Sequence, residues 1–185
     1  ALITNKLEEK IKIYKQAGIR PYFGGTLFEI FIIRGLFDDY CRFIEKYNLD
    51  LAEVSDGSME LNHNEKCEYI SKLAKQVTVI SEVGSKQADV IIPDDEWVAQ
   101  MKSELEAGSW KVIAEARESG NIGIYNSNHS ANTSLIDDIV KHVSMESVIW
   151  EAPIKSQQAW FINLLGENVN LGNIAPNEVI SLETL

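Results

Sequence analysis

The chain has 185 residues, enough for one domain with a substantial core, and its hydrophobic fraction of 45% is typical of a globular protein. Its formal net charge of -11 argues against nucleic acid or an anionic membrane surface as a partner, because the long-range field repels both. No apolar run reaches transmembrane length, and no secretory signal pattern opens the chain. The two cysteines, Cys41 and Cys67, lack a CxxC partner, so a reduced, cytoplasmic protein is expected.

Short apolar strands alternate with longer amphipathic helices along the chain. The expected helices cover residues 5–17, 27–47, 64–74, 96–107, 135–143 and 156–165. The expected strands cover residues 19–23, 49–54, 77–83, 110–116, 147–150 and 169–171. The three histidines, His63, His129 and His142, show no metal-ligand spacing and are expected at the surface.

The alternation of strand and helix predicts a parallel sheet with helices outside it. A doubly wound open sheet and a closed barrel both fit this order. Polar residues follow every strand rather than one pair of strands, which favours the barrel. We therefore expect a (β/α)8 TIM-type barrel, forming a single domain over residues 1–185 that is incomplete at both ends, with its first strands absent from the sequence.

Four expected strands carry a glutamate near the end: Glu53, Glu82, Glu115 and Glu151. A carboxylate inside an apolar strand is costly to desolvate unless it meets a cation or hydrogen-bond donors. The repeated position suggests a magnesium site, whereas an internal ion-pair network is the structural alternative. Because the strands of a barrel are staggered, we expect only two or three of the four to face the ion. Asp56 is a further metal candidate, although Asp-Gly after a strand is also common turn chemistry.

Cations follow some of the same strands. Period-two counting places Lys86 on the same strand face as Glu82, where a lysine could donate a proton, although a lysine after a strand is more often solvated. The same counting places Arg117 beside Glu115, as a candidate for binding phosphate or carboxylate or for a plain salt bridge.

Backbone and amide groups supply weaker candidates for anion binding. The turn formed by Gly24 and Gly25 can expose N–H groups at a helix start, although glycines also serve sharp turns. Asn170 and Asn173 lie at the last strand, where barrel phosphate sites often form, although asparagine also caps helices.

The segments PYFGGTLFE, AEVSDGS, ISEVGSK, VIAEARESGNIGIY, IWEAPIKSQQAWFI and NVNLGNIAPNEVISLETL together resemble the phosphosulfolactate synthase family over nearly the whole chain. The resemblance implies an eight-stranded barrel and a lyase that adds sulfite to phosphoenolpyruvate with Mg2+, giving (2R)-phospho-3-sulfolactate for coenzyme M or sulfolactate synthesis. The family's catalytic lysine corresponds to Lys86. Arg117, Lys155 and the glycine turn are then expected to hold phosphate, carboxylate and sulfite, in a homo-oligomer.

Some features depart from the family. Family members have strands before the first helix and an arginine-containing tail after Leu185, and Phe23 stands where proline is common. The segment over residues 87–95 is shorter than the family's loop after the lysine. Two other functions are compatible with the resemblance, namely a non-catalytic relative of the heat-stress-associated plant proteins and another magnesium-dependent enolisation enzyme, such as a racemase or dehydratase.

Overall fold

A computed structural model describes residues 6–86 and 90–184. The helices are α1 (Leu7–Gln16), α2 (Gly25–Ile33), α3 (Phe37–Lys46), α4 (His63–Leu73), α5 (Asp94–Glu106), α6 (Thr133–His142), α7 (Lys155–Leu165) and α8 (Val179–Leu182), with a 3-10 turn η1 (Met145–Ser147). The strands are β1 (Leu51–Val54), β2 (Thr78–Val83), β3 (Lys111–Ala114), β4 (Val148–Glu151) and β5 (Leu171–Gly172).

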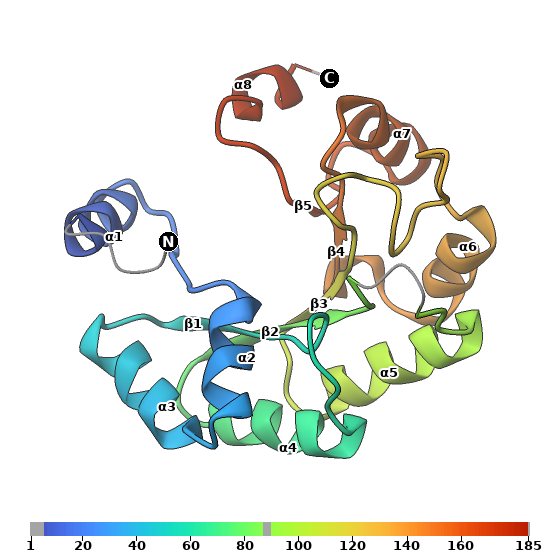
Figure 1. Cartoon of the computed structure of the whole chain (residues 1–185). Coiled ribbons are helices and arrows are strands. Elements are labelled where there is room, and N and C mark those ends of the chain that lie inside the picture. The colour runs from blue at the N-terminus through green and yellow to red at the C-terminus, as the bar shows by residue number, and fades with distance from the viewer. Residues whose placement is uncertain (1–5, 87–89, 185) are drawn as a thin grey trace.

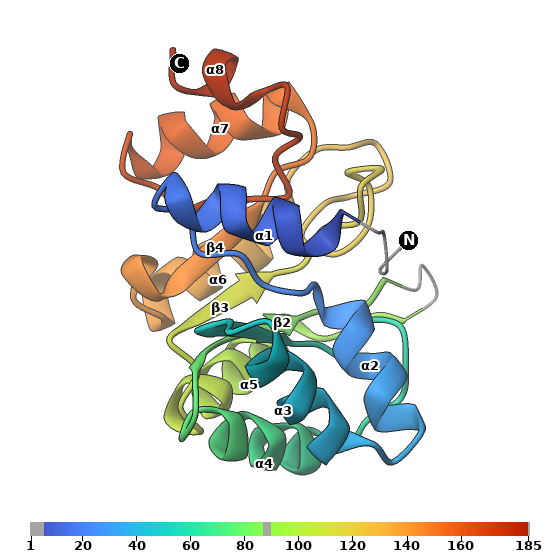
Figure 2. The ribbon, with the colours of Figure 1, turned by 90° about the vertical axis from the view of Figure 1, so that its left-hand side faces the viewer.

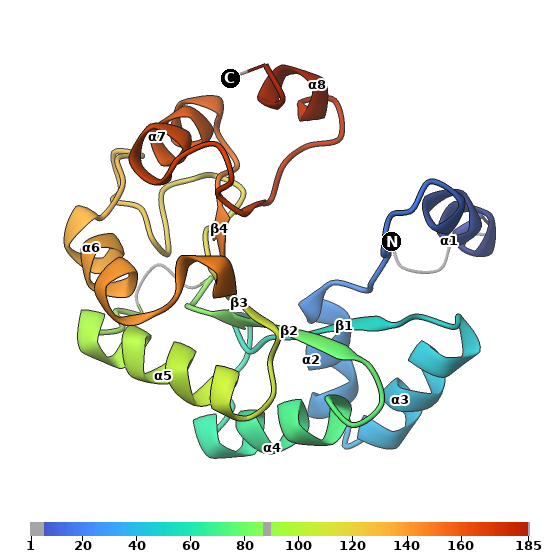
Figure 3. The same cartoon turned by 180° about the vertical axis from the view of Figure 1, so that it is seen from behind.

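The five strands form one parallel sheet in the order β1-β2-β3-β4-β5. The sheet curves, and helices α2 to α7 cover its convex side (Figure 1). Seen from behind, the same helices follow the outside of the curve (Figure 3). Sequential strand order with every crossover helix on one side is the arrangement of a TIM-type barrel and excludes a doubly wound sheet, in which the order reverses. The predicted fold class is confirmed.

Helices α1 and α8 stand on either side of the open side of the sheet (Figure 1), and the view from that side shows α1 crossing in front of the strands (Figure 2). Neither helix lies among those on the convex side. In the part of the chain that the structure describes, no helix is long and apolar enough to cross a membrane.

Two residue sets alternate along the strands, as a sheet with two covered faces requires. Outward-facing residues such as Val54, Val83 and Trp150 pack under the helices in two large buried clusters. Inward-facing residues form a smaller cluster of Leu51, Ile80 and Ile113, with Ile149 packed against it. This aliphatic layer closes the interior of the curved sheet below the carboxyl ends of the strands.

The expected strand over residues 19–23 is wrong, since no strand forms there. Pro21 has no N–H for a ladder, and Arg20 uses its side chain to reach the Asp50 carboxylate at 2.9 Å. Phe23 is buried and packs its ring on Phe43 and Tyr47. The segment is therefore held by side chains, and the described sheet has five strands instead of the six expected.

The expected helix over residues 27–47 is two helices, α2 and α3. Gly35 lies between them with φ 68°, a left-handed conformation that ends an α-helix. At the two chain ends the differences are smaller. Residue 5 of the first expected helix lies outside the described residues, and the last strand is shorter than expected, at Leu171–Gly172.

One expectation about the histidines is also wrong. His129 and His142 are exposed, as expected, but His63 is half-buried between two helices. Its Nε2 atom lies 2.6 Å from the Ser103 hydroxyl, so α4 and α5 share this contact. Cys67 lies one helical turn from His63, with its Sγ atom 3.6 Å from the same nitrogen.

The interior aliphatic layer gives a direct test of the fold. Replacing Ile80, 2% exposed, with alanine removes apolar contacts and leaves a cavity, so we expect a loss of about 2–5 kcal/mol in unfolding free energy. Ile33→Ala is the matched control, because Ile33 is 67% exposed and should lose little. Chemical denaturation measures both, and equal losses for the two variants would contradict the assigned interior layer.

Candidate active site

The interior aliphatic layer is followed by a layer of carboxylates. Each glutamate lies two residues after an inward-facing aliphatic residue, which places it on the same strand face one step nearer the carboxyl end. The four pairs are Leu51 and Glu53, Ile80 and Glu82, Ile113 and Glu115, and Ile149 and Glu151. The parallel register of the sheet thus converts a repeated sequence position into one acidic site at the strand ends.

Three of these carboxylates converge. Glu82, Glu115 and Glu151 each offer an oxygen, and these oxygens all lie within 4.8 Å of one another. Glu82 and Glu115 are buried, and Glu151 is half-buried with its Oε2 atom accepting a 2.8 Å hydrogen bond from the Ala116 N–H. We call these three side chains the carboxylate cluster.

Glu53 belongs to the same layer but uses its carboxylate differently. Its Oε1 atom accepts a 2.6 Å hydrogen bond from the Gly25 N–H at the start of α2. A Cβ on Gly25 would lie 2.5 Å from this Oε1 and 2.2 Å from the Ser55 hydroxyl, so only glycine allows this approach. The described structure therefore directs this N–H of the glycine turn at a protein carboxylate, and Gly24 beside it is exposed.

The cluster carries more negative charge than its surroundings balance. Burial raises the pKa of Glu115, and the charges of Glu82 and Glu151 raise it further. Burial also raises the pKa values of Glu53 and Glu151. Among the described residues, neither oxygen of Glu115 has a hydrogen-bond partner. Converging carboxylates whose negative charge is only partly balanced fit a divalent cation such as Mg2+, which prefers oxygen ligands.

Lys86 supplies a cation to this site. Its Nζ atom lies 2.9 Å from Glu82 Oε1 and 4.0 Å from Glu115 Oε2, and its side chain is 30% exposed. Burial alone would lower the pKa of the Lys86 ammonium, but the charges of Glu82 and Glu115 outweigh burial and raise it. The site therefore holds a protonated amine beside the carboxylate cluster.

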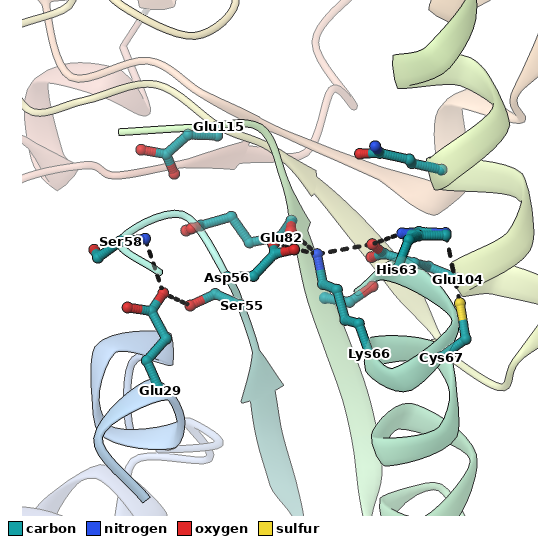
Figure 4. A network of polar contacts seen from close by, with 12 residues as sticks. Glu29, Ser55, Asp56, Ser58, His63, Lys66, Cys67, Glu82, Glu104 and Glu115 are labelled. Carbon is teal, nitrogen blue, oxygen red and sulfur yellow. Dashed lines mark hydrogen bonds and ion pairs between the residues drawn. The ribbon is translucent and has the colours of Figure 1, made fainter. Parts of the chain in front are cut away.

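Asp56 lies apart from the carboxylate cluster. Its Oδ1 atom pairs at 2.7 Å with the Nζ atom of Lys66 (Figure 4). This pairing gives the Asp56 carboxylate a protein cation of its own, whereas Lys86 lies near Glu82 and Glu115 of the cluster. Asp56 as a metal ligand remains a prediction.

The other predicted binding residues occupy different positions. Arg117 and Lys155 are exposed just after β3 and at the start of α7, and neither forms an ion pair with any residue in 6–86 or 90–184. Asn173 donates from its amide to the Ala116 carbonyl at 3.1 Å, next to the site. Asn170 instead donates to the carbonyls of Glu146 and Val148, at the start of β4, so the structure does not bring it to the carboxylates.

An ionic pair behind the site, Lys66 and Glu104, was not predicted from the sequence. The side chain of Lys66 is 1% exposed and that of Glu104 is 0% exposed, with Nζ and Oε1 2.8 Å apart. Both occupy core positions of amphipathic helices, since Lys66 shares a stripe with the buried Ile70 and Leu73. A charged residue on an apolar stripe was the available signal.

A second missed residue is Glu29 in α2, which is buried and has no counterpart in the strand layer. Its Oε1 atom accepts a 2.6 Å hydrogen bond from the Ser55 hydroxyl and lies 3.4 Å from the Ser58 N–H (Figure 4). Glu29 thus ties the loop after β1 to α2. It follows four apolar or small residues on a strongly apolar helix, which could have identified it as a buried carboxylate.

The fold and the site together define a TIM-barrel-type enzyme with an acidic site at the carboxyl ends of its strands, where Lys86 contacts Glu82. A sequence model of the (2R)-phospho-3-sulfolactate synthase (ComA) family matches residues 1–185. The chain belongs to this family.

Three curated relatives support this assignment, and each is named phosphosulfolactate synthase. The relative from Bacillus subtilis (strain 168) is 38% identical over 188 residues, covering 100% of this chain and 75% of the relative. The relative from Methanothermobacter thermautotrophicus is 38% identical and that from Methanocaldococcus jannaschii 40% identical, each over 183 residues and 97% of this chain. The alignments cover 71% and 73% of these two relatives.

The unbalanced carboxylates predict a stability that depends on pH and on cations. A carboxyl whose pKa is raised on folding keeps its proton in the folded state while the unfolded chain loses it. The unfolding free energy therefore falls as pH rises above the ordinary carboxyl value of 4.5. In a chelator we expect stability to fall from pH 5 to pH 8, and added Mg2+ should reverse most of the loss.

Glu115→Gln identifies the source of this effect, because the amide cannot ionise. Thermal unfolding of this variant should show a shallower pH slope and a smaller stabilisation by Mg2+ than the unaltered protein. Glu106→Gln is the matched control, since Glu106 is exposed at the end of α5. A pH slope that is the same in all three proteins would contradict the assigned repulsion within the cluster.

Proposed function

We propose that this protein is a phosphosulfolactate synthase that adds sulfite to phosphoenolpyruvate with Mg2+ and forms (2R)-phospho-3-sulfolactate. The observation that carries the proposal is the position of Lys86, with its Nζ atom 2.9 Å from Glu82 and beside three converging carboxylates. The names of the three relatives and the match over residues 1–185 support the same reaction.

The reaction forms one bond and moves one proton. The sulfur lone pair of sulfite forms a C–S bond with the terminal vinyl carbon, and the π electrons move towards the carbon that bears the phosphate. The carboxylate shares the resulting negative charge. A proton delivered to that carbon completes the product, with the phosphate ester intact.

Lys86 suits the role of proton donor. The raised pKa of its ammonium keeps it charged before sulfite adds, and its partly exposed side chain permits reprotonation from solvent. A fixed lysine delivers the proton to one face of the substrate only, as a single product stereoisomer requires.

Glu82, Glu115 and Glu151 would hold the Mg2+. Bound there, the ion supplies positive charge that stabilises the negative charge developing on the substrate carboxylate. Without such a cation, the three converging carboxylates would repel a multiply charged anion.

Arg117 and Lys155 are the proposed contacts for the substrate's phosphate and carboxylate. Both follow strand ends, both are exposed, and both are unpaired within the described ranges 6–86 and 90–184. In a chain with a formal net charge of -11, two such cations at one end of the sheet would give an anionic substrate a local binding surface. Residues 87–89, which follow Lys86 in the sequence, lie outside the described residues.

The proposed proton donor can be tested by replacement. Lys86→Ala should lower kcat about a hundredfold or more while the KM for phosphoenolpyruvate changes little, because proton delivery belongs to the transition state. The measurement is formation of phosphosulfolactate from phosphoenolpyruvate, sulfite and Mg2+. Lys141→Ala is the matched control, since Lys141 is 65% exposed on α6.

Two outcomes would contradict the proposal. Near-normal kcat in Lys86→Ala would remove this lysine from the mechanism. Absence of turnover in the unaltered protein with sulfite would exclude the proposed reaction, and solvent proton exchange on other carboxylate substrates would then favour the enolisation alternative.

A further inference from the structure

The ammonium of Lys66 contacts three oxygens from three different elements on the outer side of the sheet. Its Nζ atom lies 2.7 Å from Asp56 Oδ1, 2.6 Å from the backbone carbonyl of Glu82, and 2.8 Å from Glu104 Oε1. Figure 4 shows Lys66 at the centre of these contacts, between the strand that bears Glu82 and the helix that bears Glu104. The side chain of Lys66 is 1% exposed, so it does not touch substrate.

Burying the ion pair of Lys66 and Glu104 in the core has a high desolvation cost. Burial raises the pKa of the Glu104 carboxyl, which the Lys66 charge opposes, and burial alone would lower the pKa of Lys66. Apolar side chains of similar volume usually give the same stability or more. The two charges therefore call for a role other than stabilising the fold.

The bond to the Glu82 carbonyl indicates that role. Pairing between β1 and β2 ends at Val54 and Ser81, one residue before Glu82. On that side of the strand Lys66 donates to the Glu82 carbonyl in place of a ladder partner. The side chain of Glu82 points inward, where its carboxylate lies 2.9 Å from the Lys86 Nζ atom and converges with Glu115 and Glu151.

The bond to Asp56 fixes a second wall of the site. The Gly57 carbonyl accepts a 3.0 Å hydrogen bond from the Lys86 N–H, and a Cβ on Gly57 would lie 3.0 Å from Glu82 Oε1. The turn after β1 therefore packs directly against both functional side chains. By holding Asp56 and Glu82 at once, Lys66 sets the distance between this turn and the end of β2.

The other three glutamates of the layer are held in a comparable way. The Glu53 carbonyl accepts a hydrogen bond from the Tyr40 hydroxyl at 3.1 Å, and the Glu151 carbonyl accepts one from the Tyr125 hydroxyl at 2.8 Å. The Glu115 carbonyl accepts from the Ile124 N–H at 3.0 Å. Each interior carboxylate thus has its backbone carbonyl fixed by a donor from outside the strand ladder, and Lys66 supplies the charged one.

We propose that Lys66, held by Glu104, is a positioning residue that sets the Glu82 carboxylate and Lys86 in the geometry needed for proton transfer. The expected loss of turnover rests on the proposed function. The expected displacement of the Glu82 carboxylate does not depend on it. A displacement of about 1 Å in a catalytic group can lower turnover by about a hundredfold, so a loss of this anchor should be visible in kcat.

The double variant Lys66→Met and Glu104→Gln removes both charges with nearly unchanged volume. We expect its Tm to stay within about 5 °C of the unaltered protein, because the pair adds little net stability. We expect kcat for sulfite addition to fall by roughly tenfold to a hundredfold, with less than about a threefold change in the KM for phosphoenolpyruvate. A purely structural role would lower Tm and leave kcat of the folded fraction unchanged, and that result would overturn the proposal.

The matched control is Lys72→Met with Glu68→Gln, an exposed pair on the same helix with its charged atoms 3.6 Å apart. It should keep both kcat and Tm. If the first double variant does not fold, Lys66→Arg retains the charge opposite Glu104 but not the compact ammonium that meets three oxygens. A selective fall in its kcat would support positioning, and unaltered kcat would contradict it.

Direct binding of Mn2+ separates this proposal from the proposed function. If the unaltered protein does not add sulfite to phosphoenolpyruvate, the proposed function fails, and calorimetric titration with Mn2+ alone then decides the positioning role. A Kd raised about tenfold in the double variant would support an altered Glu82 position, as expected for a residue that orients a ligand. Equal Kd values would contradict it.

Discussion

The site depends on one constraint, the enclosure of four carboxylates at the carboxyl ends of adjacent parallel strands. Like charges at this separation cannot all ionise in a dry interior without compensation. The chain compensates some of them with the Gly25 N–H, the Ala116 N–H and Lys86. It leaves Glu115 without a hydrogen-bond donor among the described residues. A divalent cation can balance this remaining negative charge.

The residues that surround the four carboxylates hold them in position. The aliphatic residues below the carboxylates exclude water from one side, and glycines allow backbone and side chains to approach from the other. Gly84, with φ 131°, shows how closely they approach, since a Cβ there would lie 2.6 Å from the Cβ of Glu115 and 2.5 Å from the Trp97 ring. Donors from α3, α4 and the loop after β3 hold the strand carbonyls. The helices therefore fix the position of the functional side chains as well as covering the sheet.

Much of the site could be predicted from residue patterns. The strand-end positions of Glu82, Glu115, Glu151 and Lys86 follow from period-two alternation and from the rule that parallel strands end at one edge. The strand over residues 19–23 could not be rejected in this way, because its apolar pattern equally suits a segment that packs its side chains without a ladder. The helix break at Gly35 was not predicted, because apolar residues continue on both sides of it.

The sequence by itself determined the parallel α/β fold class, the family and the set of inward-facing carboxylates, because these depend on local periodicity and on short motifs. Only the tertiary structure decided which of them meet. The Glu53 carboxylate accepts a hydrogen bond from the Gly25 N–H of α2, and the Asp56 carboxylate pairs with Lys66. The Asn170 amide donates to the Val148 carbonyl, at the other end of β4 from the carboxylates. These contacts depend on the stagger of the strands and on partners that are distant in the sequence. Asp56 and Lys66 are 10 residues apart, and Glu53 and Gly25 are 28 residues apart. Local periodicity does not predict contacts at such separations.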